Sequence, residues 1–267
     1  MLRKYWHVLN IGIQNTLVYR VNFFFRSLFG LVPLTATLSL WTTIYSGSQS
    51  SVAGYSLAQM VSYYLVVTLV DMLTAVAEDD WQIAADIKDG RISQFLLKPM
   101  NYLAYRLTLF GAGRLIYSSV ALIPVGLFIA WHGSDFVFPS HASTWVAFGA
   151  SLVLTALLQF FVSFSLALLA FWLQEVSTLI FIVFAFEYIA GGHLFPLDIL
   201  PPWGQKLLLC TPFPYQLYLP VNIYLERTAG AELLAGLAIQ LLWVILTYGL
   251  ARFVWSRGVR HYEAVGG

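Results

Sequence analysis

Long apolar runs recur along the whole chain and are separated by short polar segments. Six of them approach the roughly 20 residues that a helix needs to cross a hydrocarbon layer. They cover residues 23–45, 57–76, 107–131, 145–171, 178–190 and 233–254. The fifth run is short, because Gly191 and Gly192 interrupt it. The pattern predicts an all-α integral membrane protein, a single domain over residues 1–267 with six transmembrane helices.

Residues 191–231, between the fifth and sixth runs, are rich in proline. Six of the ten prolines lie there, namely Pro196, Pro201, Pro202, Pro212, Pro214 and Pro220. The apolar piece 207–218 is broken by two of them and is too short to span. We expect a re-entrant helical hairpin in the outer leaflet, buried by the other helices. An additional spanning segment is the alternative.

The first 20 residues have the pattern of an interfacial helix. Apolar side chains recur at helical spacing, whereas His7, Asn10 and Gln14 fall on another face. Such a helix would lie flat under the inner leaflet, with Trp6 at headgroup level and Arg3 and Lys4 facing anionic lipid. Alternatively, this segment extends the first spanning helix.

Composition supports a membrane protein. Charged residues make up 10% of the chain and apolar residues 59%, whereas soluble domains carry roughly 25% charged residues. A net charge of +1 gives no basic field for nucleic acid. The single cysteine, Cys210, excludes an intramolecular disulfide framework and a multi-cysteine metal site.

The distribution of Lys and Arg predicts the orientation. With the N-terminus inside, the inner segments hold Arg3, Lys4, Arg20, Lys88, Arg91, Lys98, Arg106, Arg252, Arg257 and Arg260, and the outer loops hold Lys206 and Arg227. The positive-inside rule therefore places both termini in the cytoplasm. Arg26 and Arg114 sit near inner helix ends, where long side chains can snorkel. N-terminal charges that extend to Arg26 also argue against a signal peptide.

The one sizeable cytoplasmic segment covers residues 77–106. Glu78, Asp79 and Asp80 suit the start of a helix, and Gly90 supplies a left-handed residue at its end. A short helix there would be tied to the second and third spanning helices, so that a push on it moves both. A solvated loop with ordinary caps is the alternative.

Signatures of catalysis are missing from the sequence. The five histidines, His7, His132, His141, His193 and His261, are dispersed and predict no metal site. No Gly-x-Ser-x-Gly elbow and no phosphate-binding Gly-Lys-Ser/Thr loop is present. We therefore expect no enzyme activity and no cofactor bound by this chain.

Several motifs carry a family resemblance. The stretch 86–92, Asp-Ile-Lys-Asp-Gly-Arg-Ile, followed by Phe-Leu-Leu-Lys-Pro at 95–99, resembles the cytoplasmic loop of type-2 ABC transporter permeases. Segments 170–172, 191–197, 200–203, 211–213 and 220–224 look like the same family's pattern after its fifth helix. The resemblance covers essentially the whole chain and is nearest to the branch that includes viologen-type exporters.

The resemblance implies a half-transporter in the bacterial cytoplasmic membrane. Two permeases, identical or homologous, would form the path, and each would dock a cytoplasmic ATPase that binds ATP and Mg²⁺. Docking would use the helix from Asp79 to Gly90. Ile83 and Ile87 are one turn apart and would insert as an apolar stripe into a groove on the ATPase. Asp79, Asp86 and Arg91 would fix the register.

Ionisable residues inside the apolar runs are candidates for the path, because burying them is costly. Asp71 lies in the second run and Glu187 in the fifth. With Phe184, Phe186 and Tyr188 nearby, these carboxylates would suit a cationic, aromatic-stacking compound. The alternatives are a structural pair, for example Glu187 with Arg114, and aromatic side chains that face lipid or core.

Other functional classes stay open. A secondary transporter or channel could use the buried carboxylates for proton coupling, and copurification of an ATPase would separate it from an ABC permease. A membrane-embedded enzyme lacks a recognisable set of catalytic residues. A partner permease that completes a heterodimer without touching cargo is equally compatible with the sequence.

Overall fold

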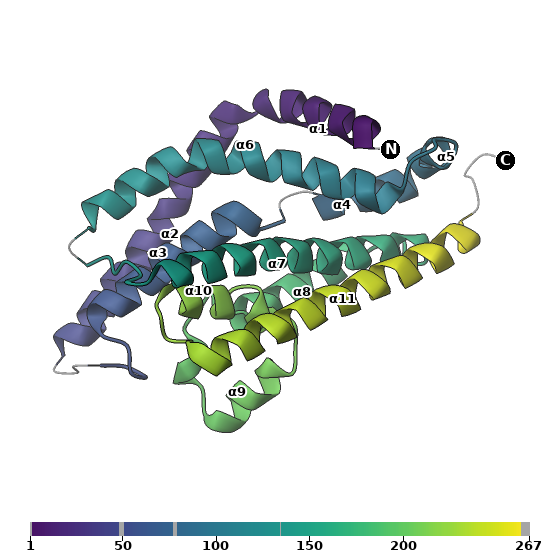
Figure 1. Ribbon diagram of the computed structural model, residues 1–267. Helices are drawn as coiled ribbons and strands as arrows, with labels where there is room; N and C mark the ends of the chain where they lie inside the picture. Colours follow the sequence, from purple (N-terminus) through teal and green to yellow (C-terminus); the bar gives the residue numbers. More distant parts are fainter. Residues whose placement is uncertain (1, 48–50, 77–78, 134, 263–267) are drawn as a thin grey trace.

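The computed structural model describes residues 2–47, 51–76, 79–133 and 135–262, and within that part the chain is helical, with no β-strand. Figure 1 shows the helices as a bundle whose longest members lie side by side. Their bounds are α1 (Leu2–Leu17), α2 (Arg20–Ser46), α3 (Leu57–Thr74), α4 (Asp79–Lys88), α5 (Arg91–Leu96), α6 (Tyr102–Trp131), α7 (Ala142–Ala167), α8 (Ser177–Ala190), α9 (Pro202–Leu209), α10 (Tyr218–Tyr224) and α11 (Gly230–His261).

Five helices are long and apolar enough to span a membrane. They are α2, α3, α6, α11 and α7 with the 3₁₀ turn η1 (Leu168–Phe171) that continues it. The sixth predicted span corresponds to α8, which has only 14 residues and a length of about 21 Å. The integral membrane class is thus supported, and α8 differs from the other five because the Gly191–Gly192 turn ends it.

Helix α1 is separate from α2 and packs along α6. Residues 18 and 19 form a turn between α1 and α2, so the two are not one continuous helix. The backbone N–H of Asn101 donates to the Tyr5 hydroxyl at 3.2 Å, and Gly12 lies against Ala112. Hence α1 runs in the same direction as the first part of α6 (Figure 1). The prediction that α1 lies flat beneath the inner leaflet stays a prediction.

The two ends of the bundle are distinct. The start of α1, α5 and the end of α11 share one end (Figure 1), called here the α5 end. There the hydroxyls of Ser93 and Tyr262 lie 2.9 Å apart. At the opposite end the carboxylate of Glu226 accepts hydrogen bonds from the backbone N–H groups of Ser140 and His141 at 2.9 and 3.0 Å. The chain therefore enters and leaves the bundle at the same end.

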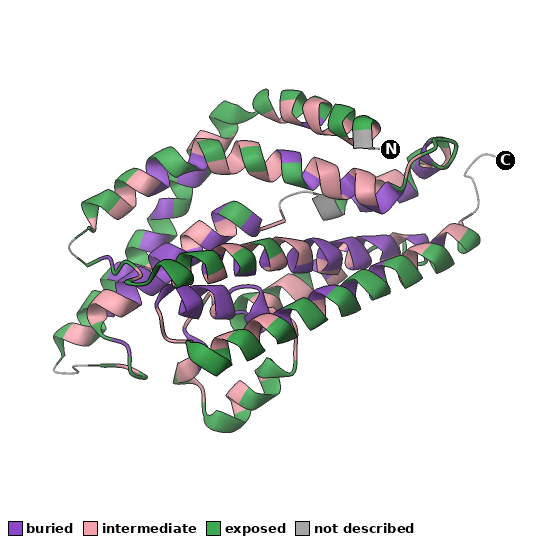
Figure 2. Ribbon diagram, viewed as in Figure 1, coloured by how far each residue is buried: buried purple, intermediate pink, exposed green. Residues whose placement is uncertain are grey.

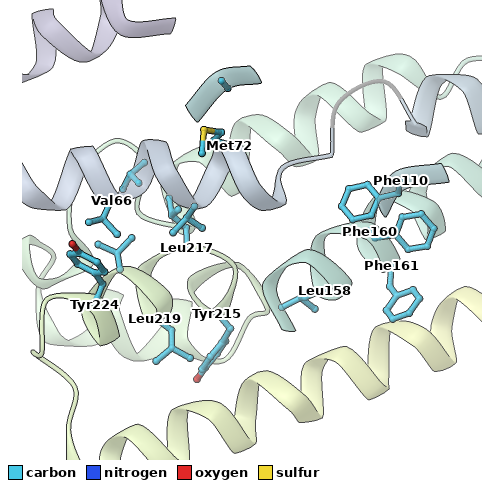
Figure 3. Close-up of a cluster of buried hydrophobic side chains, with 14 of the residues drawn as sticks. Val66, Met72, Phe110, Leu158, Phe160, Phe161, Tyr215, Leu217, Leu219 and Tyr224 are labelled. Atoms are coloured by element: carbon cyan, nitrogen blue, oxygen red, sulfur yellow. The ribbon is translucent and has the colours of Figure 1, made fainter. Parts of the chain in front are cut away.

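The best-buried helices are α3, α7 and α10. Figure 2 shows α10 in the buried colour and α11 largely exposed, and Figure 3 shows side chains of α3, α7 and α10 packed together, with Val66, Leu158 and Tyr224 among them. The side-chain amide of Gln240 joins α11 to this core, because it donates hydrogen bonds to the backbone oxygens of Ser151 on α7 and of Tyr215. Buried polar groups that are satisfied in this way fix the register of packed helices.

The proline-rich segment forms two short helices, as predicted, but with different bounds. The exposed α9 and the buried α10 flank a short 3₁₀ turn, η3 (Phe213–Tyr215), so the predicted hairpin over 207–218 covers only the end of α9 and the start of α10. Tyrosines of α3 anchor the chain before α9. Tyr63 donates to the Gly192 oxygen at 2.6 Å and Tyr64 to the Leu194 oxygen at 2.9 Å. This irregular backbone is therefore held by the bundle itself.

Candidate functional site

Two adjoining cavities lie inside the bundle. The larger, of about 340 Å³, is lined by α2, α3, α6 and residues around the end of α8, and the smaller, of about 170 Å³, is lined by α3, α7 and α8. Their shared wall is formed by Asp71, Ala75, Val76, Tyr188 and His193. The carboxylate of Asp71 therefore faces both cavities.

Asp71 is paired with a histidine that the chain brings back after α8. Nε2 of His193 lies 3.1 Å from Oδ1 of Asp71, and the ring of Tyr188 stacks on the imidazole at 5.1 Å with an interplanar angle of 16°. The turn that allows this depends on Gly192, whose φ of +94° is left-handed and favours glycine. The pair Gly191–Gly192 thus positions the next side chain.

Glu187 has a different environment from Asp71. It lines the smaller cavity together with Phe184, Tyr188 and Asp71, so the four residues proposed from the sequence for a path lie together. Among the residues that the structure describes, no salt bridge and no side-chain hydrogen bond to Glu187 is present. The alternative pairing of Glu187 with Arg114 is not formed. A role of the four residues in transport stays a prediction.

Two site residues were missed by the sequence reasoning, His193 and Gln159. Oε1 of Gln159 and Nδ1 of His193 are buried without a hydrogen-bond partner in the described part of the chain, and both residues line the smaller cavity. An amide in the middle of an apolar run and a histidine after two glycines were the available signals. Both side chains therefore have unused hydrogen-bonding capacity, buried in the wall of the cavity.

The larger cavity carries charges of both signs. Arg26 and Arg114 line it along with Asp71, and the guanidinium of Arg114 lies 4.9 Å from the centre of the Tyr117 ring. Where the two cavities meet, Asp71 and Tyr188, with Glu187 on the side of the smaller cavity, provide hydrogen-bond acceptors and a π face. This combination fits an organic cation that carries N–H donors.

A second candidate site is α4, at the α5 end. Asp86 on α4 faces inward, where Nη2 of Arg106 lies 2.6 Å from its Oδ2 and the Tyr102 hydroxyl donates to the same oxygen at 2.9 Å. Arg106 is only 4% exposed. Gly90, with φ +75°, makes the left-handed turn between α4 and α5, as the sequence predicted. The helix is therefore fixed to α6 by a buried ion pair.

The predicted apolar stripe on α4 is not a docking surface. Ile83 and Ile87 are 1% and 3% exposed and belong to this chain's own core, because α4 packs against α7 and η1. The exposed side of α4 instead presents Trp81, Gln82, Lys88 and Asp89.

The predicted register residues also need correction. Asp86 points into the bundle, so it does not face a partner. Arg91 is exposed and pairs with Asp89, whose carboxylate raises the pKa of the Arg91 guanidinium. Glu78 and the side chains of Asp79 and Asp80 lie outside the described residues. The charged group available for a partner therefore centres on Lys88, Asp89 and Arg91.

Comparison with known proteins identifies the family of this chain. A family model described as ABC-2 family transporter protein matches residues 31–266, which is nearly the whole chain. The comparison with curated proteins gives no match. The described part of the chain contains no group of three or more His, Cys, Asp or Glu side chains suited to a metal ion.

Proposed function

Since this chain belongs to the ABC-2 family of transporter membrane proteins, the type-2 ABC permeases, we propose that it is the membrane subunit of an ATP-driven exporter. The working unit is a dimer of permeases, identical or homologous, in the bacterial cytoplasmic membrane. Each permease docks a separate cytoplasmic ATPase, which binds ATP and Mg²⁺.

We propose six crossings with both termini in the cytoplasm. Five long helices alone would leave the two chain ends on opposite sides, yet the start of α1 and the end of α11 lie at the same end of the bundle (Figure 1). A further crossing between η1 and α11 resolves this. α8 and the turn after it supply that crossing, and α9 and α10 form the re-entrant segment at the outer side. The excess of Lys and Arg places the α5 end inside.

The observation that carries the proposal is the attachment of α4. This helix lies between the spanning helices α3 and α6 in the chain, and the Asp86–Arg106 ion pair holds it to α6. A rigid attachment transmits displacement, whereas a flexible loop would absorb it. Closure of the ATPases on ATP therefore moves α4 together with α6 and changes access to the cavities beside Asp71.

The docking test targets the exposed side of α4. We expect Trp81→Ala with Lys88→Glu to leave the permease folded and dimeric and to abolish copurification of its ATPase. Trp203→Ala is the matched control, because Trp203 is a 72% exposed tryptophan on α9, remote from the α5 end. Full stoichiometry of the ATPase on the double variant, with normal ATP-dependent transport, would remove α4 as the coupling element.

The native cysteine offers a test of the topology. Cys210 is the only cysteine and is exposed, next to α9. We expect an impermeant thiol reagent to label it from outside intact cells only. In a Cys210→Ser chain, a cysteine introduced at Leu97, which is 88% exposed beside α5, is labelled only from the cytoplasmic side. The reverse pattern contradicts the orientation.

A second candidate function is a secondary transporter, which the Asp71–His193 pair favours because such a pair can carry a proton. Purified permease in vesicles without an ATPase separates the two. Substrate movement driven by a proton gradient supports the secondary transporter, and movement that requires ATP and the ATPase supports the exporter.

A further inference from the structure

A groove between α1, α2 and α6 adjoins the larger cavity and shares Arg26, Arg114 and Tyr117 with it. Its volume is about 500 Å³, and its walls include Asn15 and Tyr19 at the end of α1, Asn22 and Arg26 on α2, and Arg114 on α6. In Figure 1 this region lies where α1 meets α2 over the middle of α6. Volumes of this size are typical of small-ligand sites.

The lining of the groove favours an anion. The guanidinium of Arg26 contributes to it, and none of its described lining residues is acidic. Arg26 is exposed and makes no salt bridge with any described residue. The amides of Asn15 and Asn22 and the Tyr19 hydroxyl add hydrogen-bond donors. Arginine with neutral donors is the combination that binds phosphate oxygens in a bidentate manner.

The depth of the groove matches a lipid headgroup. α2 has 27 residues and is about 40 Å long, so that about 10 Å extends beyond a hydrocarbon core of about 30 Å. α2 begins over the middle of α6 and runs away from the α5 end (Figure 1). With the excess at the start of α2, Arg26, about 9 Å from that start, lies close to the boundary between headgroups and acyl chains. A guanidinium at that depth meets lipid phosphate directly.

The rim of the groove is apolar. Val18, Val21 and Phe25 are 77%, 62% and 49% exposed and lie next to the polar lining residues in sequence. In a membrane these side chains contact acyl chains. A soluble anion would not use this rim, whereas a phospholipid uses both the polar groove and its apolar surroundings.

We propose that this groove binds the phosphate of an anionic phospholipid in the leaflet where α2 begins, with Arg26, Asn22 and Tyr19 around the headgroup. Basic pockets between spanning helices select anionic lipids through this chemistry. Because α1 contributes one wall, a bound lipid also holds α1 to α2 and α6.

The test is lipid binding by the purified permease in detergent. We expect phosphatidylglycerol to bind and to raise the unfolding temperature, whereas phosphatidylcholine and inorganic phosphate do so much more weakly. Arg26→Gln should weaken phosphatidylglycerol binding about tenfold, the equivalent of about 1.4 kcal/mol. Arg252→Gln is the matched control, since Arg252 is an exposed arginine in the last third of α11, and it should change binding less than twofold.

A second variant keeps the proposal open to refutation if Arg26→Gln does not fold. Asn22→Ala removes one exposed headgroup donor and should weaken binding about threefold. Equal binding of phosphatidylglycerol by wild type and both folded variants would overturn the site. Equal protection by inorganic phosphate would show a soluble-anion site and overturn the lipid assignment, and equal binding of phosphatidylcholine would overturn the charge selection.

Discussion

Two carboxylates of this permease, Asp86 and Glu187, are held in opposite ways. Asp86 accepts from Arg106 and Tyr102 and lies within 3.8 Å of Arg91. Glu187 lines a cavity and has no ion pair or side-chain hydrogen bond with any described residue. A paired buried charge connects helices, whereas an unpaired one at membrane depth is costly and is therefore a candidate for a functional role. Asp86 joins α4 to α6, and Glu187 lines the smaller cavity.

The largest expected effect comes from breaking the buried ion pair between Asp86 and Arg106. Arg106→Ala leaves Asp86 without its main cationic partner in a largely buried position, which costs about 3 to 5 kcal/mol of folding free energy. Unfolding of the detergent-solubilised protein, followed by tryptophan fluorescence, measures this loss. Arg91→Ala is the control for the same carboxylate, because Arg91 is 58% exposed and exposed ion pairs add little to stability. Equal effects of the two variants would contradict the contrast in burial.

A smaller loss of stability is expected at Gly192, whose turn positions His193 beside the smaller cavity. In Gly192→Ala the new Cβ lies 2.7 Å from the Tyr63 hydroxyl oxygen at a φ of +94°, which costs about 1 to 3 kcal/mol. The variant should also displace His193 and lower transport. Gly249→Ala, on α11 with open space around its Cβ, should change neither stability nor transport. A Gly192→Ala protein with wild-type stability would show that this turn is not strained.

Glu187→Gln should change stability by about 1 kcal/mol or less, because few contacts depend on the charge. Export of cationic, aromatic compounds should fall severalfold, since the carboxylate that attracts the cation is lost. Glu232→Gln, on the exposed first turn of α11, is the control for charge removal. Loss of the folded protein with Glu187→Gln would instead indicate a structural pair, and unchanged export would remove Glu187 from the path.

A third carboxylate, Glu226, is less deeply buried. It tests whether hydrogen bonds alone hold residues 140–144 in place. The bond from the backbone N–H of His141, together with the His141 side chain and the Thr144 hydroxyl, lowers the pKa of Glu226 from the usual 4.5 to about 2. A lowered folded pKa means that the stabilisation is complete above about pH 4.5 and is lost as the pH falls toward 2. The protection of the backbone amides of residues 140–144 against hydrogen exchange, taken relative to the intrinsic exchange rate at each pH, should fall across that window.

The matched variant isolates this group from the other carboxylates that titrate in acid. In Glu226→Gln, the protection of the same amides, relative to the intrinsic exchange rate, should already be lower at neutral pH and should lose most of its acid dependence. An identical pH profile of this protection in the wild type and the variant would show that Glu226 does not hold residues 140–144 in place.

Much of the fold was predictable because it depends on local composition and periodicity. The long apolar runs located α2, α3, α6, α7 and α11 within a few residues, and two adjacent glycines marked the short α8. The left-handed Gly90 was also predicted correctly. Which face of α4 is buried was predicted wrongly, because Ile83 and Ile87 read as a surface stripe when the helix is considered without α7 and η1 beside it.

The sequence by itself determined that this chain is a membrane protein, where its helices lie and to which family it belongs, since hydrophobic runs, charge asymmetry and motifs are local properties. It also identified Asp71, Glu187, Phe184 and Tyr188 as a group. Only the tertiary structure decided that His193 returns to pair with Asp71, that Arg106 takes Asp86, and that Arg26 lines a groove with α1. These pairings join residues far apart in the chain, and their energies depend on burial and on partners that no single segment contains.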